Sequence, residues 1–440
     1  MNQSFSVENM QAIWDQQTRK GDRLLGYYPT VAEKFELRRE ARKELRQQPS
    51  NASIAVLLKE AADKATLEAD MALHQALTAT SRLLIRQVEE HAFNWGLHSN
   101  GEYKGRMTYA LREDAVAFFA DRQLQRTLDS LNGHRPPSRQ SIAAGLGRNM
   151  DSRLPKLLVR TDIERFYDNV DHELMRQRLL REQLTPTFRR LIEALLREMA
   201  AFTGAERGLP RGVGLSAKLA EFFLQDLDRE LRSHPRVSFY GRYVDDIVMV
   251  LGERESGEID AGKTLAHIHS VMARQKLNLS TTKTTSQRTD IDGNIPSFDF
   301  LGYQFSCQPK LDIRLTAARE LEIMRRIDLT FAAWAKADAN NHGRRRLLLD
   351  RVRYLTGNTR LANNKRNAMI GIYFSNPHLT GSGSLAALDA HLQSSIVAAK
   401  IPPEIRMKLD AISFRAGYDE RAVHTFTAAQ RKQLRGAWIA

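Results

Sequence analysis

The sequence predicts an α+β protein in which a mixed central part lies between two mostly helical parts. From about Ser6 to His98, apolar residues recur at spacings of three and four, which is typical of helices. Between Gly101 and Phe305, short β-like runs alternate irregularly with amphipathic helices, and a helical pattern returns afterwards. Irregular alternation favours an α+β core over a doubly wound parallel sheet.

The individual elements of the central part follow from local periodicity. The predicted strands are Lys156–Thr161, Val237–Tyr243, Ile247–Leu251 and Phe298–Phe305. The predicted helices are Glu173–Arg181, Ala217–Leu231 and Leu265–Leu277. A helix over Leu315–Ala335 opens the C-terminal part, and Thr380-Gly-Ser-Gly-Ser384 has the composition of a flexible joint.

Composition indicates a nucleic-acid partner. The chain has 440 residues, enough for two or three domains, with 66 Lys+Arg against 52 Asp+Glu and a formal charge of +14. Such a charge attracts a polyanion through counterion release. The alternative is an ordinary basic enzyme, so the motifs must decide.

Cysteine content and hydropathy indicate the compartment. A single cysteine, Cys307, excludes an internal disulfide framework and any multi-cysteine zinc site. No apolar run approaches the length of about 18 residues that a membrane span needs. We therefore expect a cytoplasmic protein without a membrane partner.

The strongest local feature is Tyr243-Val-Asp-Asp246, which lies between two predicted strands. Asp245 and Asp246 would then occupy a hairpin turn. Clustered carboxylates repel one another unless a cation compensates them, and such hard oxygen ligands suit Mg²⁺. The alternative is that the pair merely forms the turn, because Asp is a common turn residue.

A third aspartate, Asp162, ends another predicted strand. Phosphoryl transfer with two metals needs carboxylates from separate strands around ions roughly 3.5–4 Å apart. We expect Asp162 and Asp245 to bridge the two ions, with Asp246 as a supporting carboxylate.

These two motifs resemble those of the reverse transcriptases. That family has a first motif of an aspartate followed by an aromatic pair, here Asp162 with Phe166 and Tyr167. Its third motif is an aromatic, any residue, then Asp-Asp, here Tyr243–Asp246.

Three further motifs follow the family's order. Gly208-Leu-Pro-Arg211-Gly212, with Ser216, resembles the second motif, a Gly-rich turn before a helix beneath the template and incoming nucleotide. The family usually has Gln at the position of Arg211. Leu277-Asn-Leu-Ser-Thr-Thr-Lys283 resembles the fourth motif, and Phe300-Leu-Gly302-Tyr303 resembles the fifth, the primer grip.

The resemblance implies a right-hand polymerase. Its parts would be a helical N-terminal extension over 1–100, fingers over 101–155, a palm over 156–305, a basic helical thumb over 306–380 and a helical C-terminal extension over 381–440.

The resemblance also implies roles for single residues. Two Mg²⁺ ions would be held by Asp162, Asp245, Asp246 and the backbone carbonyl of Ile163, and Lys283 would act near the triphosphate and protonate pyrophosphate. The nucleotide would contact Ile163, Tyr167, Pro210, Arg211, Gly212 and Ser216, with Tyr167 as a steric gate that favours deoxynucleotides. The primer grip would be Leu301, Gly302 and Tyr303. Together they imply an RNA-directed DNA polymerase with an RNA template, dNTPs and a DNA product.

Two C-terminal segments suggest a narrower class. Arg353-Tyr-Leu-Thr-Gly-Asn-Thr-Arg-Leu-Ala-Asn-Asn-Lys365 and Gly371-Ile-Tyr-Phe-Ser-Asn376 resemble bacterial defence-associated reverse transcriptases of the abortive-infection-like, unknown-group class, in particular the third type. This implies antiphage defence, a noncoding RNA, and a second polymerase subunit or a homo-oligomer.

Two other functions stay open. One is a mobile-element or diversity-generating reverse transcriptase, which would need an endonuclease partner; the sequence shows no Cys/His endonuclease finger. The other is a noncatalytic RNA-binding scaffold, in which degenerate catalytic positions are expected, whereas Asp162, Asp245, Asp246 and Lys283 are all present.

Overall fold

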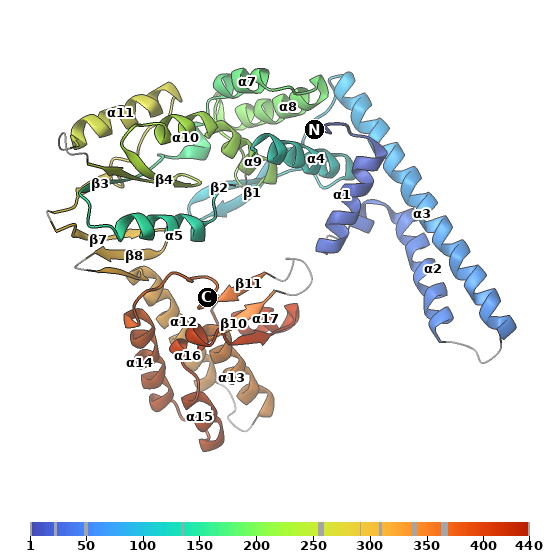
Figure 1. Ribbon diagram of the computed structural model, residues 1–440. Helices are drawn as coiled ribbons and strands as arrows, with labels where there is room; N and C mark the ends of the chain where they lie inside the picture. The colour runs from blue at the N-terminus through green and yellow to red at the C-terminus, as the bar shows by residue number, and fades with distance from the viewer. Residues whose placement is uncertain are drawn as a thin grey trace. The chain divides into compact units, whose positions relative to one another are not determined.

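A computed structural model describes residues 2–21, 24–47, 52–133, 136–253, 259–290, 292–307, 310–336, 341–361 and 368–438. The chain forms two compact units, and Figure 1 labels most of their elements. The first comprises Met1–Pro136, Ile163–Glu230 and His269–Leu279, and the second comprises Pro137–Asp162, Leu231–Ile268 and Ser280–Ala440. Over these described ranges, every helix is too short or too polar to cross a membrane.

The first unit begins with the predicted helices. They are α1 (Val7–Lys20), the 3-10 turn η1 (Leu24–Tyr27), α2 (Pro29–Arg46) and α3 (Ala52–Glu89), and α2 and α3 run side by side in Figure 1. The Ser6 side chain caps α1 by accepting from the Asn9 N–H, and Gly21 ends it at φ 87°. Leu73, Leu77 and Leu84 bury one stripe of α3. The helical prediction is therefore confirmed.

The rest of the first unit is a hairpin and a group of helices. The hairpin pairs β1 (His98–Tyr103) with β2 (Arg106–Ala110). The helices are α4 (Ala115–Leu131), α6 (Phe166–Asn169), α7 (His172–Arg181), α8 (Pro186–Thr203), α9 (Gly214–Phe223) and α10 (Gln225–Arg232), the last of which runs two residues past the unit.

One helix prediction in this unit is wrong. Ala217–Leu231 was expected to be continuous, but the helix breaks at Leu224 between α9 and α10. Three consecutive apolar residues, Phe222–Leu224, are all buried. A straight helix buries a single stripe, so the break allows all three side chains to reach the core.

The second unit contains an antiparallel sheet of order β4-β5-β3-β6. Its strands are β3 (Lys156–Asp162), β4 (Val237–Tyr243), β5 (Asp246–Gly252) and β6 (Thr285–Arg288), with α5 (Arg139–Met150) packed on β4 and α11 (Ala261–Arg274) running on into the first unit. Successive residues such as Leu157, Leu158 and Val159 are all buried, so both faces of the sheet are covered. The predictions for β3, β4 and β5 are confirmed.

A second, three-stranded sheet corrects another prediction. Instead of one strand over Phe298–Phe305, the chain forms β7 (Ile295–Phe300) and β8 (Tyr303–Cys307), followed by β9 (Leu311–Leu315). Leu301 and Gly302 both have positive φ, 49° and 76°, which reverses the chain. The residues on both sides of the turn alternate between apolar and polar, as in a single strand, so the sequence pattern did not reveal the turn.

The remainder of the second unit is mostly helical. It contains α12 (Ala317–Ala335), α13 (His342–Thr356), α14 (Gly383–Ala398), α15 (Pro403–Asp410), α16 (Phe414–Asp419) and α17 (Ala428–Arg435). A small sheet of β11 (Met369–Gly371), β10 (Asn358–Arg360) and β12 (Val423–Thr425) was not expected. Strands of three residues are too short to show alternation, and fully buried Asn358 joins them by donating to the Gly417 and Ala422 carbonyls.

The predicted flexible joint is wrong as well. Thr380 makes two hydrogen bonds to the backbone of β9: its N–H donates to the Ile313 carbonyl at 3.1 Å, and its side-chain hydroxyl accepts from the Ile313 N–H at 2.7 Å. Ser384 accepts from the Leu315 N–H at 3.1 Å. The Gly-Ser composition permits flexibility, but these bonds dock the segment along a strand edge.

Candidate active site

Three carboxylates gather at one end of the four-stranded sheet, and we call them the carboxylate edge: Asp162, Asp245 and Asp246. In the antiparallel register, Asp162, the last residue of β3, lies opposite Asp246, the first residue of β5. Asp246 also pairs with Tyr243 of β4, so Val244 and Asp245 form the hairpin turn. The predicted turn between two strands is confirmed, but only Asp245 lies in it, because Asp246 already pairs as the first residue of β5.

The turn itself is strained. Val244 has φ 60°, a left-handed conformation that a β-branched residue rarely adopts. Such a residue costs about 1–3 kcal/mol and persists where its surroundings impose it. Here the Arg242 guanidinium donates to the Val244 carbonyl at 2.9 Å. Strain of this kind is concentrated at functional sites.

Lys283 joins the carboxylate edge from the segment before β6. The Ser280 N–H donates to the Asp162 carbonyl at 2.8 Å, and the Thr161 and Thr284 hydroxyls lie 2.7 Å apart. These bonds fix the loop so that Lys283 Nζ lies 2.7 Å from Asp162 Oδ2. The hydrogen bond to Asp162 raises the pKa of Lys283, and the charges of Asp246 and Asp245 reinforce this effect.

The environment of Asp246 disfavours its charged form. Burial, reinforced by the charges of Asp245 and Asp162, raises its pKa to about 6. The carboxylates therefore repel one another, and the charge of Lys283 offsets this effect on Asp246 only in part. A divalent cation would remove this penalty.

The carboxylate edge opens into a cavity of about 300 Å³ in the second unit. Its lining residues are Arg160, Thr161, Asp162, Asp246, Thr282, Lys283, Thr285, Asp299 and Phe300. Arg160 donates to the Asp299 carbonyl at 2.7 Å. The sequence analysis missed Arg160 and Asp299, although residues two apart in a strand share a face, which places Arg160 with Asp162.

The fit to metal rests on donor chemistry. Within the described ranges, no three acidic, histidine or cysteine side chains are arranged to hold an ion as they stand. Lys283 lies against one of the carboxylate oxygens a metal would use. Because Lys283 is 62% exposed, its ammonium can move away and free Asp162. Three carboxylates with oxygen ligands then match the preference of Mg²⁺.

All of the predicted nucleotide-binding residues lie in the first unit. Arg211 is partly exposed and Pro210 is buried. Gly212 has φ 95°, and a Cβ there would lie 2.8 Å from the Tyr109 carbonyl, so the close approach that requires glycine is to β2. Ser216 is fully buried, and its hydroxyl has no hydrogen-bond partner in the described part of the chain.

Ile163 is predicted to hold an ion through its backbone carbonyl. Ile163 directly follows Asp162, its side chain is fully buried, and it forms an antiparallel bridge with Leu279. The roles of the Ile163 carbonyl and the Ser216 hydroxyl stay predictions.

The predicted primer grip is the β7–β8 turn. Leu301 and Gly302 occupy the turn, and both are partly exposed. Tyr303 is fully buried, with its hydroxyl donating to Gln140 at 2.6 Å and the Arg139 guanidinium 5.1 Å from its ring centroid. Tyr303 therefore anchors the turn on α5, while Leu301 and Gly302 are accessible to a ligand.

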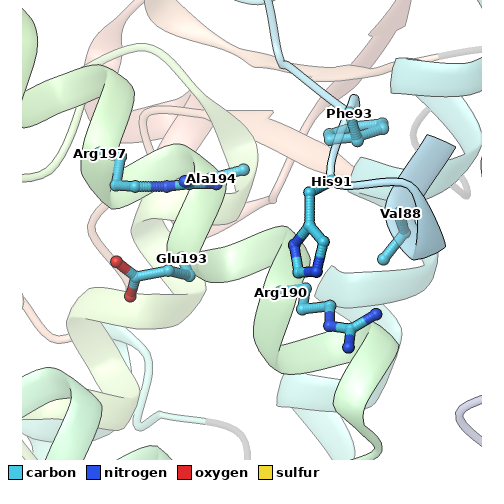
Figure 2. Close-up of a pocket in the computed structure, with 7 residues that line it drawn as sticks. All are labelled: Val88, His91, Phe93, Arg190, Glu193, Ala194 and Arg197. Atoms are coloured by element: carbon cyan, nitrogen blue, oxygen red, sulfur yellow. The ribbon is translucent and has the colours of Figure 1, made fainter.

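Figure 2 shows a separate cavity of about 170 Å³ in the first unit. It lies between His91, just after α3, and Arg190 and Arg197 of α8. Glu193 accepts two hydrogen bonds from Arg176, both at 2.9 Å. No residue proposed for the active site lines this cavity.

Comparison with known proteins identifies the central domain. Residues 111–305, which include the four-stranded sheet with the carboxylate edge, match the family described as reverse transcriptase (RNA-dependent DNA polymerase). The central part of the chain is thus similar to a reverse-transcriptase domain, the predicted α+β fold is confirmed, and the match supports the predicted RNA-directed DNA polymerase class.

Other comparisons find distant similarity. No curated protein matches the sequence. One similar solved structure is apo telomerase from Candida tropicalis truncated from its C-terminal domain, with 12% identity and a TM-score of 0.38. The alignment covers 55% of this chain and 60% of that one, so this chain spans less than two thirds of the telomerase length.

Proposed function

We propose that this protein copies an RNA template into DNA, with the carboxylate edge as its catalytic centre. The observation that supports this most directly is the pairing of Asp162 with Asp246 across β3 and β5, next to Asp245 in the turn. Asp162, Asp245, Asp246 and the Ile163 carbonyl would hold two Mg²⁺ ions. When bound, they supply Lewis-acid activation of the primer 3′-hydroxyl and neutralise the charge of the departing pyrophosphate.

Lys283 would act on the leaving group. Its raised pKa keeps the side chain protonated at neutral pH, so it carries both a positive charge and a proton. Proton donation to a leaving group by a positioned side chain is general acid catalysis. The side chain is exposed enough to turn from Asp162 to a phosphate oxygen.

The first unit would supply the nucleotide contacts. Tyr167 would act as the steric gate against a 2′-hydroxyl, and Arg211 and Gly212 would contact the incoming nucleotide. The β7–β8 turn, with Leu301 and Gly302, would hold the primer end. These assignments are supported by the order of the five motifs, and they make dNTPs the substrates and DNA the product.

The partner would be an RNA. A net charge of +14 favours binding to a polyanion, and the basic residues Arg344, Arg345, Arg346, Arg351 and Arg353 fall on one helix, α13. We also propose a role in antiphage defence with a dedicated noncoding RNA and a second polymerase subunit or homo-oligomer. The support is the C-terminal resemblance, part of which, residues 362–365, lies outside the described residues.

Sequencing of nucleic acid that co-purifies with the protein tests this proposal. The wild type, the Asp245→Asn variant and an Asp328→Asn control, altered at an exposed aspartate paired with His391, would be compared with dNTPs or NTPs and Mg²⁺. We expect one defined RNA in all three and new DNA in the wild type and control only. RNA without synthesis in any of them would favour the noncatalytic scaffold, whereas product inserted into genomic sites would favour a mobile element.

A further inference from the structure

Arg211 stands where the reverse transcriptases usually have Gln. It makes one contact with the predicted gate, Tyr167, and one with the next residue, Asp168. Its Nε donates to Asp168 Oδ1 at 3.3 Å, and its guanidinium carbon lies 5.0 Å from the Tyr167 ring centroid. Both partners are adjacent residues of α6. We call Tyr167, Asp168 and Arg211 the gate corner.

Backbone hydrogen bonds hold the gate corner together. The Leu209 N–H donates to the Tyr167 carbonyl at 2.7 Å, and the Gly208 N–H donates to the Val170 carbonyl at 2.8 Å. The Tyr109 N–H donates to the Arg211 carbonyl at 2.7 Å. The segment that carries Arg211 is thus fixed on one side to α6 and on the other to β2.

Asp168 is shared between two arginines. Besides Arg211, the Arg106 guanidinium lies 3.6 Å from its Oδ2. All of these side chains except Tyr167 line one cavity of about 470 Å³ in the first unit, together with the basic residues Lys104 and Arg165. Asp168 is the one carboxylate among the lining residues, so it provides the fixed negative charge that holds the guanidinium groups in place.

We infer that Asp168 is a positioning residue for sugar selection, because it holds the Arg211 guanidinium against the Tyr167 ring and so fixes the ring's orientation. An arginine plane stacked on an aromatic face is attractive, and a planar guanidinium does this better than an ammonium group. A gate excludes a 2′-hydroxyl only if its ring cannot turn aside. Asp168 restricts that rotation through Arg211, without itself touching the nucleotide.

Without Asp168, Arg106 and Arg211 lose the carboxylate that pairs with both of them. Arg106 and Arg211 would then repel each other within one cavity, and Arg211 would follow solvent or nucleotide phosphates instead of the ring. Tyr167 would keep its backbone position but lose its lateral support. Discrimination against ribonucleotides should then fall more than the rate of DNA synthesis.

The inference rests on the proposed function, since it concerns the nucleotide that the polymerase selects. Its test is the ratio of kcat/KM for a dNTP to that for the matching rNTP, measured on the full chain with its co-purified RNA. We expect Asp168→Ala and Arg211→Lys each to lower this ratio about fivefold, the effect of losing a contact worth about 1 kcal/mol. Asp168→Glu should restore most of it.

Controls separate this role from general destabilisation. Asp70→Ala removes an exposed ion pair with Arg38 elsewhere in the first unit and should leave the ratio unchanged. Tyr167→Ala should lower the ratio most, and melting temperatures identify any misfolded variant. An unchanged ratio in both Asp168→Ala and Arg211→Lys, with active wild type, overturns the inference and leaves the proposed function standing. A wild type that incorporates no nucleotide overturns both.

Discussion

The carboxylate edge and the gate corner use charge in opposite ways. At the carboxylate edge, the β3–β5 register brings like charges together, and burial with two neighbouring carboxylates raises the pKa of Asp246. At the gate corner, one carboxylate lies between two guanidinium groups. At the first site neighbouring carboxylates disfavour one another's charged form, whereas at the second the carboxylate has oppositely charged partners within the protein.

The comparison separates two requirements of a polymerase site. A centre that performs chemistry benefits from uncompensated charge, because ligand binding then relieves a cost that the fold imposes. A centre that selects among similar ligands benefits from side chains that stay in place. We therefore expect changes at the carboxylate edge to abolish activity and changes at the gate corner to alter specificity.

Loss of Asp162 should have the largest effect. Asp162→Asn removes the charge shared by Lys283 and the metal site, and we expect DNA synthesis to fall at least about a thousandfold, equivalent to about 4 kcal/mol. Product formation with dNTPs and Mg²⁺ measures this. Retention of activity within tenfold of wild type would place the catalytic centre elsewhere.

Lys283 should have an intermediate effect. Lys283→Ala removes both the charge and the proton, and we expect kcat to fall about a hundredfold, at the lower end of general acid catalysis. Lys283→Arg keeps the charge but not an available proton, so it should restore nucleotide affinity more than kcat. Single-turnover rates against dNTP concentration separate the two. Lys276→Ala, which removes the ion pair with Asp171, serves as the control.

The smallest effect concerns a buried carboxylate of the first unit that lies outside both sites. Asp121 on α4 is 8% exposed, and burial raises its pKa to about 6 from 3.8, opposed by Arg122, the Gln125 side chain and the Leu215 backbone. The folded state therefore binds more protons than the unfolded state between these values. Stability should fall as pH rises from about 4 to about 6 and stay level above that range.

Asp121→Asn tests this prediction. The amide keeps a hydrogen-bonding group for Gln125 and removes the charge, so the unfolding free energy at pH 7 should rise by on the order of 1–3 kcal/mol. Urea unfolding of wild type and variant across pH 4–7 gives the difference. If the two curves stay parallel over this range, Asp121 is not the titrating group.

The catalytic motifs were predictable because they depend on short segments. Strands β3, β4 and β5 follow from apolar runs, and the Asp245 turn follows from the interruption between two of them. The break at Leu224 and the turn at Leu301 were not predictable, because in each case the residues on both sides continue the pattern of a single element. Gly-Ser composition at 380–384 likewise suggested freedom that hydrogen bonds to β9 remove.

The sequence by itself determined which side chains are proposed to carry the chemistry, because the order of the motifs and the strand ends predict that three aspartates and a lysine lie together. Only the tertiary structure decided which of these side chains contact one another. Antiparallel register sets Asp162 against Asp246, and the loop before β6 brings Lys283 to Asp162. Likewise, only folding shows that Arg211 pairs with Asp168 and covers Tyr167. These contacts join residues that are far apart in the sequence, so local sequence patterns do not predict them.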